Sequence, residues 1–341
     1  MKYVVILGDG MAGYPMPDRG NKTCLQLANT PFFDELAKKS TIGLAKTVPD
    51  GYAPGSDVAN LSVMGYDPKE FYTGRSPLEA ASIGIPLADD DVTYRCNLVT
   101  LSEETPYEAK RMIDYSSGEI TTREAHELID ALKQEFDKPP FTLYAGISYR
   151  HCLVARGGKT GSVLTPPHDI TDRPVAGFLP KGAMGETLLA MMKRSYEILN
   201  DHPVNRARRA AGKNPANSAW FWGEGTKPLL RPFSDLYGKR GAVISAVDLV
   251  KGIGILAGMD VLEVAGATGN WDTNFAGKAD AAADALLDGT DFVYVHMEAP
   301  DECGHHGDAD KKIYSIEQVD GVAERIARRL NAAGEAFSML I

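Results

Sequence analysis

The sequence predicts an α/β fold built on a mainly parallel sheet. Two observations support this prediction: short solid runs of β-branched and aliphatic residues recur along the chain, and helical patterns separate them. Strands that helices cover on both faces have this composition. We expect strands at residues 3–7, 242–245, 261–264, 292–297 and 336–341, and helices at residues 30–39, 247–257, 279–287 and 311–333.

The residues at the ends of these runs indicate where the predicted strands end and where the helices begin. The first strand leads into Gly8-Asp9-Gly10, and the helix after it has Pro31 in its first turn, where a missing N–H is tolerated. The strand at 292–297 leads into the acidic segment 298–308. Because ligands bind beyond the carboxyl ends of strands in an open parallel sheet, we expect these two segments to face one crevice.

The middle of the chain has a different pattern. Between residues 93 and 231, alternating strands, helices and proline-rich joints such as Lys138-Pro139-Pro140 and Thr165-Pro166-Pro167 follow one another. We interpret this stretch as a second, α+β domain that is inserted into the first. The prediction is a core of residues 1–92 and 232–341 and an inserted domain of residues 93–231.

Composition excludes several classes of protein. The 341 residues are 44% hydrophobic and 24% charged, and no run of about 18 apolar residues could span a membrane. A net charge of −10 argues against nonspecific nucleic-acid binding. The N-terminus lacks a signal-peptide layout and the four cysteines form no Cys-x-x-Cys pair, so we expect a cytoplasmic protein without disulfides. We expect a small phosphorylated molecule as the partner, and the sequence leaves open whether the protein forms a homo-oligomer.

A hydroxyl and an acidic turn together indicate a metal-activated nucleophile. Ser56 lies in Pro54-Gly55-Ser56-Asp57-Val58-Ala59-Asn60, and a serine hydroxyl must lose its proton before it attacks phosphorus. The carboxylate of Asp9 could hold a divalent ion that assists this step. Asp301 and His305 are four residues apart, so one turn of helix brings both to one side. A carboxylate with an imidazole suits zinc, manganese or iron better than calcium.

Each of these residues also has a structural interpretation. Ser56 alone would more often be a helix N-cap, and Asp9 alone would be part of a turn. We expect His306 to be an exposed neighbour of the site. His296, inside an apolar strand, is expected to be a hydrogen-bonded core histidine. The combination of the separate segments favours the metal site over these structural alternatives.

Basic residues form the second part of the predicted site. Arg95, Arg150 and Arg206 lie within the inserted region, and Lys239 precedes a core strand. A guanidinium binds phosphate or carboxylate through two parallel hydrogen bonds, which a lysine cannot imitate. As a set these residues fit an anionic phosphorylated ligand, whereas each alone would be an ordinary surface charge. The pair His168-Asp169 either adds a polar contact or closes a turn.

Six segments occur in the same order as in a known protein family: Gly8-Asp9-Gly10-Met11-Ala12, Pro54 to Asn60, Gly74-Arg75-Ser76-Pro77-Leu78-Glu79-Ala80, Arg95-Cys96-Asn97, Tyr149-Arg150-His151 and Ala299 to His305. On these segments the chain resembles the cofactor-independent phosphoglycerate mutases of the archaeal type, within the alkaline phosphatase superfamily. The resemblance spans essentially the whole chain. It implies an alkaline-phosphatase-like core with an inserted lid domain that binds substrate. It also implies a metalloenzyme that interconverts 2- and 3-phosphoglycerate through a phosphoserine.

The resemblance further implies roles for individual residues. Ser56 matches the serine that accepts the phosphoryl group and contacts a metal, and Asp9 matches a ligand of that metal. Asp301 and His305 match ligands of a second metal. The substrate-binding residues by the same analogy are Arg95, Arg150, His151, Asp169, Arg206 and Lys239. The implied cofactors are two divalent metal ions, with Mn²⁺ as the usual one and Mg²⁺ or Zn²⁺ as alternatives.

Two features leave alternatives to the mutase open. In the family, the strand that corresponds to residues 336–341 is followed by an Asp-His pair and a further histidine, which complete the metal sites. This sequence ends at Ile341, so we expect incomplete metal sites in the chain as given. The opening Gly8-Asp9-Gly10-Met11-Ala12 resembles bacterial members that are proposed to be homoserine kinases. A homoserine kinase, a metal-dependent phosphatase and an inactive fragment are therefore the alternatives.

Overall fold

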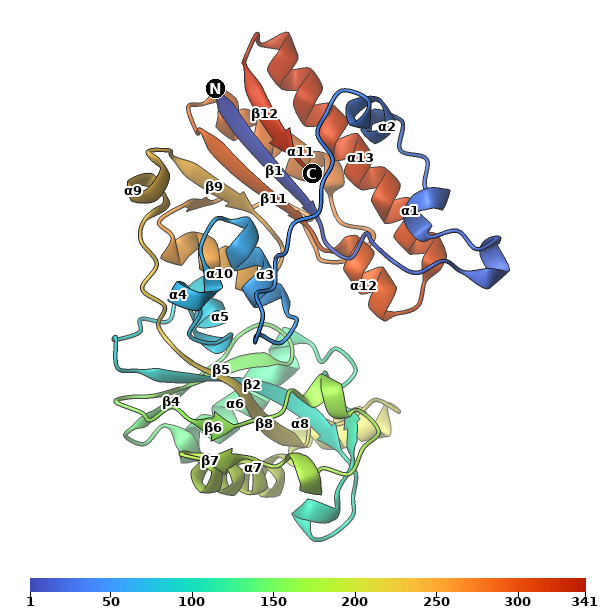
Figure 1. Ribbon diagram of the computed structural model, residues 1–341. Helices are drawn as coiled ribbons and strands as arrows, with labels where there is room; N and C mark the ends of the chain where they lie inside the picture. The colour runs from blue at the N-terminus through green and yellow to red at the C-terminus, as the bar shows by residue number, and fades with distance from the viewer. The chain divides into compact units, whose positions relative to one another are not determined.

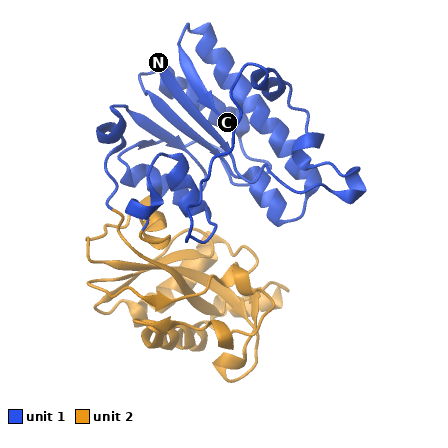
Figure 2. Cartoon of the chain, in the orientation of Figure 1, with its two compact units in different colours: residues 1–72, 229–341 blue, residues 73–228 orange.

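The computed structural model describes all 341 residues, and the chain forms two compact units. Figure 2 shows them in two colours. Unit 1 comprises residues 1–72 and 229–341, and unit 2 comprises residues 73–228. Unit 2 is therefore one continuous segment of the chain, inserted between the two segments of unit 1.

The boundaries of unit 2 differ from those placed by the sequence, which were residues 93 and 231. Unit 2 begins at Thr73 because helix α5 (Ser76–Ser82) packs on two strands of this unit, β2 (Val92–Leu101) and β8 (Ser218–Thr226). The sequence pattern of a short helix before a strand does not show which sheet that helix covers.

Unit 1 is built on a parallel sheet of five strands (Figure 1). The strand order is β10-β9-β11-β1-β12, so the first strand of the chain lies between two strands from its last fifty residues. The parallel sheet is confirmed, although the strand expected at 261–264 is reduced to two residues. The strands are β1 (Lys2–Gly8), β9 (Gly241–Ile244), β10 (Asp260–Val261), β11 (Phe292–Met297) and β12 (Phe337–Leu340).

Helices cover both faces of the unit 1 sheet. On one face, Val4 and Val295 belong to a buried cluster with side chains of α11 and α13. On the other face, Gly254 of α10 approaches Val243, and Tyr294 binds α3 through a hydrogen bond. The helices of unit 1 are α1 (Cys24–Leu27), α2 (Pro31–Ala37), α3 (Ser56–Val63), α4 (Pro68–Phe71), α9 (Phe233–Tyr237), α10 (Asp248–Leu256), α11 (Phe275–Leu287), α12 (Ala299–His305) and α13 (Ala309–Ala332), with a 3-10 helix at Pro17–Arg19.

The register of β1 and β11 decides which side chains share a face. Leu7 pairs with His296, and the backbone N–H of Asp9 donates to the carbonyl of Met297 (2.9 Å). Side chains alternate between the two faces along a strand. Asp9 therefore lies on the same face as His296 and Glu298, and these polar side chains lie side by side where β1 and β11 end.

Unit 2 is an α+β structure built on an antiparallel sheet. Strand β2 pairs with β5 on one side and with β8 on the other, while β3 and β4 extend the sheet. Leu128 of α6 and Leu188 of α7 join Tyr94 of β2 in one buried core. A smaller cluster beneath α5 contains Cys152 and Val154 of β5. The sheet is thus covered by α6 and α7 and, separately, by α5.

The remaining elements of unit 2 complete this description. The strands are β3 (Met112–Asp114), β4 (Phe141–Tyr144), β5 (Arg150–Ala155), β6 (Ser162–Val163) and β7 (Lys181–Gly182). The helices are α6 (Thr122–Phe136), α7 (Gly185–Leu199) and α8 (Pro203–Ala210), with 3-10 helices at Tyr107–Ala109, Pro167–Ile170 and Ala176–Phe178. No helix of the chain combines the length and the apolar content that a membrane crossing requires.

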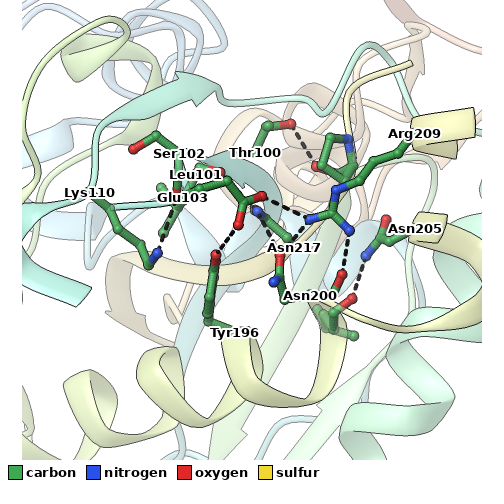
Figure 3. Close-up of polar contacts among 12 residues, drawn as sticks. Thr100, Leu101, Ser102, Glu103, Lys110, Tyr196, Asn200, Asn205, Arg209 and Asn217 are labelled. Atoms are coloured by element: carbon green, nitrogen blue, oxygen red, sulfur yellow. Dashed lines mark hydrogen bonds and ion pairs between the residues drawn. The ribbon is translucent and has the colours of Figure 1, made fainter. Parts of the chain in front are cut away.

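A buried polar network holds the connection from α7 to α8 and on to β8 (Figure 3). The side chain of Asn205 makes three hydrogen bonds of 2.8 Å: its Nδ2 donates to the carbonyls of Leu199 and Ala216, and its Oδ1 accepts from the Ala216 N–H. Asn217 binds the backbone N–H and carbonyl of Leu101 in the same way. Two asparagine amides therefore replace backbone partners where the chain is irregular.

We expect Asn205→Ala to lower the free energy of unfolding by about 2–4 kcal/mol, because the N–H and carbonyl of Ala216 and the carbonyl of Leu199 each lose a hydrogen bond. Urea unfolding followed by circular dichroism measures this change. Gln134→Ala, on the exposed side of α6 in the same unit, is the control and should change the free energy by less than about 0.5 kcal/mol. An Asn205→Ala protein as stable as the wild type would contradict this role.

Candidate functional site

Three side chains that could hold a divalent cation meet at the carboxyl edge of the unit 1 sheet. Asp9 Oδ2 lies 3.3 Å from His296 Nε2, and Glu298 Oε2 lies 3.4 Å from the same nitrogen. One ligand atom from each residue lies within 4.8 Å of the other two. Two atoms that bind one tetrahedral ion at about 2.0–2.1 Å are about 3.4 Å apart. The spacing of the three side chains therefore fits a metal ion.

Ser245, the residue directly after the neighbouring strand β9, orients the imidazole of His296. The imidazole is 1% exposed, and its Nδ1 lies 3.2 Å from Ser245 Oγ, which also accepts a hydrogen bond from the Val247 N–H (3.0 Å). A partner on the second ring nitrogen is typical of metal-binding histidines, because it fixes the ring orientation. One imidazole with two carboxylates suits manganese, zinc or iron.

His296 and Glu298 were not among the metal ligands predicted from the sequence, and the structure makes them candidates. His296 is buried and hydrogen-bonded, as expected, but its Nε2 faces Asp9. A signal was present in the sequence, since His296 and Glu298 are two residues apart at the end of a strand and so share a face. The register that brings Asp9 to that face is not visible in the sequence.

The carboxylate of Asp301 lies beside the turn that carries Asp9. Asp301 Oδ2 and His305 Nε2 are 3.1 Å apart, one turn of α12 from each other. Gly10 has φ +65°, and a side chain there would lie 2.7 Å from Asp301 Oδ1, so this position requires glycine. Burial, and then the charge of Asp9, raises the pKa of Asp301. A cation would stabilise two such neighbouring carboxylates.

Ser56 is the first residue of α3. Gly55 occupies the N-cap position, so the Ser56 hydroxyl does not serve as the cap. Asn60 Nδ2 donates to the Ser56 carbonyl (2.8 Å), and Asn60 Oδ1 accepts from the Tyr294 hydroxyl (2.7 Å). Burial, and then the charge of Asp9, raises the pKa of Tyr294. The hydrogen bond between Asn60 and Tyr294 thus connects the first turn of α3 to β11, and the charge of Asp9 acts on this tyrosine.

In unit 2, Arg95 and Arg150 lie on one face of the antiparallel sheet. Asn97 pairs with Arg150 across β2 and β5, and Arg95 is two residues from Asn97, so all three side chains share that face. Arg95 Nε donates to Asn97 Oδ1 (3.2 Å), and Arg95 Nη1 forms an ion pair with Glu79. Burial, offset in part by Glu79, lowers the pKa of Arg95 to about 10, so Arg95 is cationic at neutral pH.

His151 lies on the opposite face, because it is the next residue along β5 after Arg150. The imidazole is 3% exposed, and its Nδ1 accepts a hydrogen bond from the Gly146 N–H (3.0 Å). Burial, and then the nearby His126, lowers the pKa of His151 to about 3. The neutral ring therefore holds the turn before β5, and the structure does not bring it to the face of Arg150.

Two other predicted substrate residues of unit 2 are exposed. The Arg206 side chain is 57% exposed, and its Nη1 pairs with Asp201 Oδ2 (3.1 Å) at the start of α8. Asp169 lies in the 3-10 helix Pro167–Ile170 with its carboxylate 3.7 Å from the imidazole of the adjacent His168. The imidazole of His168 in turn lies 5.2 Å, between ring centres, from Trp222, which also contacts Arg95.

Lys239 lies at the amino edge of the unit 1 sheet. It precedes β9, and its Nζ is 5.9 Å from the ring centre of Tyr3, near the start of β1. Asp9 is at the other end of β1, and six residues of strand span roughly 20 Å. The structure therefore separates Lys239 from the metal cluster.

Comparisons with known proteins identify relatives of this chain. The pattern of the 2,3-bisphosphoglycerate-independent phosphoglycerate mutase family matches residues 37–205. A protein of that name from Methanosarcina barkeri is 51% identical over the whole chain, which spans 84% of that protein. A probable mutase of the same kind from Geobacter sulfurreducens is 50% identical over 99% of the chain and 83% of its own length.

Two solved structures have the same fold. A protein from Pyrococcus horikoshii superposes with a TM-score of 0.78 at 28% identity, covering 99% of this chain and 81% of that one. A cofactor-independent phosphoglycerate mutase from Thermoplasma acidophilum superposes with a TM-score of 0.57 at 25% identity, covering 99% and 85% of the two chains.

We expect the stability of the protein to fall between pH 7 and pH 5 partly because of His151. The pKa of His151 in the folded state lies below its value of about 6.5 in the unfolded state, so the unfolded state binds more protons in this range. This residue therefore lowers the free energy of unfolding by about 2 kcal/mol between pH 7 and pH 5. Urea unfolding at both pH values measures the loss. His151→Asn, which keeps an acceptor for the Gly146 N–H, should lose less stability on acidification. Equal losses in the two proteins would contradict the assignment.

We expect His296→Ala to weaken Mn²⁺ binding by about 10–100-fold, because it removes the nitrogen that lies between two carboxylates. Equilibrium dialysis of the purified protein measures the affinity. His306→Ala, at the exposed C-cap position of α12, is the matched control and should bind Mn²⁺ like the wild type. Unchanged affinity in His296→Ala would show that the cluster does not bind this ion.

Proposed function

Because the chain belongs to the 2,3-bisphosphoglycerate-independent phosphoglycerate mutase family, we propose that it interconverts 2- and 3-phosphoglycerate without a bisphosphoglycerate cofactor. The observation that carries the proposal is the 51% identity to a mutase over the whole chain. The geometry of unit 1 supports it, since a serine at a helix start, Ser56, lies in the same unit as the carboxylates of Asp9 and Asp301.

The proposed reaction has two steps. Ser56 Oγ attacks phosphorus, the Oγ–P bond forms, and the bond from phosphorus to the glycerate oxygen breaks. In this first step Ser56 loses a proton and the departing glycerate oxygen gains one. In the second step the other glycerate hydroxyl attacks the phosphoserine and loses a proton, and Ser56 Oγ leaves and gains one. Atoms and charge balance, and the net reaction moves one phosphoryl group between two hydroxyls.

The chain offers two sets of metal ligands for this chemistry. Asp9, His296 and Glu298 would hold one divalent ion, and Asp301 with His305 would contribute to a second. We propose Mn²⁺ for both, because mixed oxygen and nitrogen donors suit it, with Mg²⁺ or Zn²⁺ as alternatives. When bound, such ions lower the pKa of a nearby hydroxyl and neutralise phosphoryl oxygens.

We propose that Arg95 and Arg150 of unit 2 bind the substrate and that unit 2 acts as a lid on an alkaline-phosphatase-like core. A phosphoserine must be kept from water until glycerate takes the phosphoryl group back. Both arginines share one sheet face, which supports this role. For His151, Arg206, Asp169 and Lys239 the positions described above favour structural or surface roles instead.

Ser56→Ala should lower the conversion of 3-phosphoglycerate to 2-phosphoglycerate by more than about 10³-fold, because it removes the nucleophile. An enolase-coupled assay with Mn²⁺ measures the rate. Ser62→Ala, on the same helix, is the control, since its hydroxyl only donates to the Val58 carbonyl (3.2 Å). Normal turnover by Ser56→Ala would overturn the phosphoserine mechanism.

The same preparation distinguishes the mutase from its two rivals. The names of the relatives favour the mutase. A homoserine kinase would consume ATP when homoserine is added, and a phosphatase would release inorganic phosphate from 3-phosphoglycerate without forming the 2-isomer. Either result without isomerisation would replace the proposed function.

A further inference from the structure

Two guanidinium groups of unit 2 contact the same tryptophan. The Cζ atoms of Arg75 and Arg95 lie 5.4 and 5.0 Å from the ring centre of Trp222, within the range of a cation–π interaction. Trp222 is buried, and its Nε1 donates to Asn97 Oδ1 (3.0 Å), the same oxygen that accepts from Arg95 Nε. The indole is therefore a fixed platform for both arginines.

Glu79 is a counter-ion shared by the same two arginines. Its Oε1 pairs with Arg95 Nη1 and lies 3.1 Å from Arg75 Nε. Burial would raise the pKa of Glu79, but the charges of Arg95, Arg75 and Arg150 outweigh burial and lower it. The charges of three guanidinium groups thus act on one carboxylate, and like charges that are held this close repel one another. An anionic ligand would relieve this repulsion.

Arg75 is the more accessible member of the pair. Its side chain is 28% exposed, whereas that of Arg95 is 6% exposed. Gly223, with φ +64°, lies against both, since a side-chain carbon added there would be 3.8 Å from the Cβ atoms of Arg75 and Arg95. The indole and Glu79 hold the Arg75 fork before any ligand arrives, which reduces the entropy lost on binding.

We propose that Arg75 binds the carboxylate of phosphoglycerate, with Arg95 as the second cation, and so makes the site specific for an acid. This inference rests on the proposed mutase function. During the reaction the phosphoryl group is transferred to Ser56 and back, whereas the carboxylate keeps its charge throughout. A preformed, fixed guanidinium pair suits the group that is not transferred. Arg75 was not among the substrate residues predicted from the sequence.

The test uses the full chain and four proteins: wild type, Arg75→Ala, Arg75→Lys and Arg194→Ala. Arg194 is an exposed arginine of unit 2 with its own ion pair to Glu197 (2.9 Å), so it is a matched control. Calorimetric titration with D-glycerate in EDTA measures carboxylate binding without metal or phosphoryl transfer. Titration with neutral glyceramide measures binding without the charge. Steady-state rates with 3-phosphoglycerate and Mn²⁺ separate KM from kcat, and thermal melting checks the fold.

We expect Arg75→Ala to weaken D-glycerate binding and raise KM by about tenfold or more, with a smaller change in kcat. Arg75→Lys should recover only part of this loss, because an ammonium lacks the planar fork. Arg194→Ala should match the wild type. Wild-type affinity for D-glycerate in Arg75→Ala, or an equal loss of glyceramide binding, would overturn the inference.

The same data separate this inference from the proposed function. A wild type that isomerises 3-phosphoglycerate, together with Arg75→Ala at an unchanged KM, refutes the role of Arg75 and leaves the mutase standing. A wild type that does not isomerise but binds D-glycerate through Arg75 refutes the mutase and supports Arg75 as a carboxylate-binding residue.

Discussion

The register between β1 and β11 is the constraint on which the candidate site of unit 1 depends. It pairs Leu7 with His296 and carries Asp9 to the face of His296 and Glu298. A slip of one residue would turn Asp9 into the apolar cluster that α11 and α13 cover. The buried valines and isoleucines of the other face therefore hold the polar cluster in place. Core packing and the geometry of the candidate site in this unit therefore have the same origin.

Alternation of side chains also organises unit 2. Arg95 and Arg150 share one face of its sheet, while His151, one residue away from Arg150, lies under the opposite layer and supports a turn. Two neighbouring residues in one sequence motif thus have unrelated surroundings. The face of Arg95 is stabilised by a buried tryptophan and a carboxylate, and it is the more polar of the two. A sequence motif therefore shows which strand carries polar residues. The alternation of side chains along that strand decides which of these residues share a face.

Much of the fold follows from local patterns. The runs of aliphatic residues that predict β1, β9 and β11 are buried strands, because only a helix-covered sheet accommodates them. The expected strand at 261–264 was too long, and the start of unit 2 was placed too late. Both differences concern contacts between distant segments. The length of an edge strand and the sheet that a short helix covers depend on neighbours that local patterns do not contain.

The sequence by itself determined the family and the parallel sheet, since residue order and apolar periodicity are local properties. It placed Asp301 and His305 one helical turn apart because four-residue spacing does so on any helix. Only the tertiary structure decided that His296 and Glu298 join Asp9, that Arg75 contacts Trp222, and that Lys239 lies at the opposite edge of the sheet from Asp9. Strand register and long-range packing set these distances, and no short stretch of the chain records them.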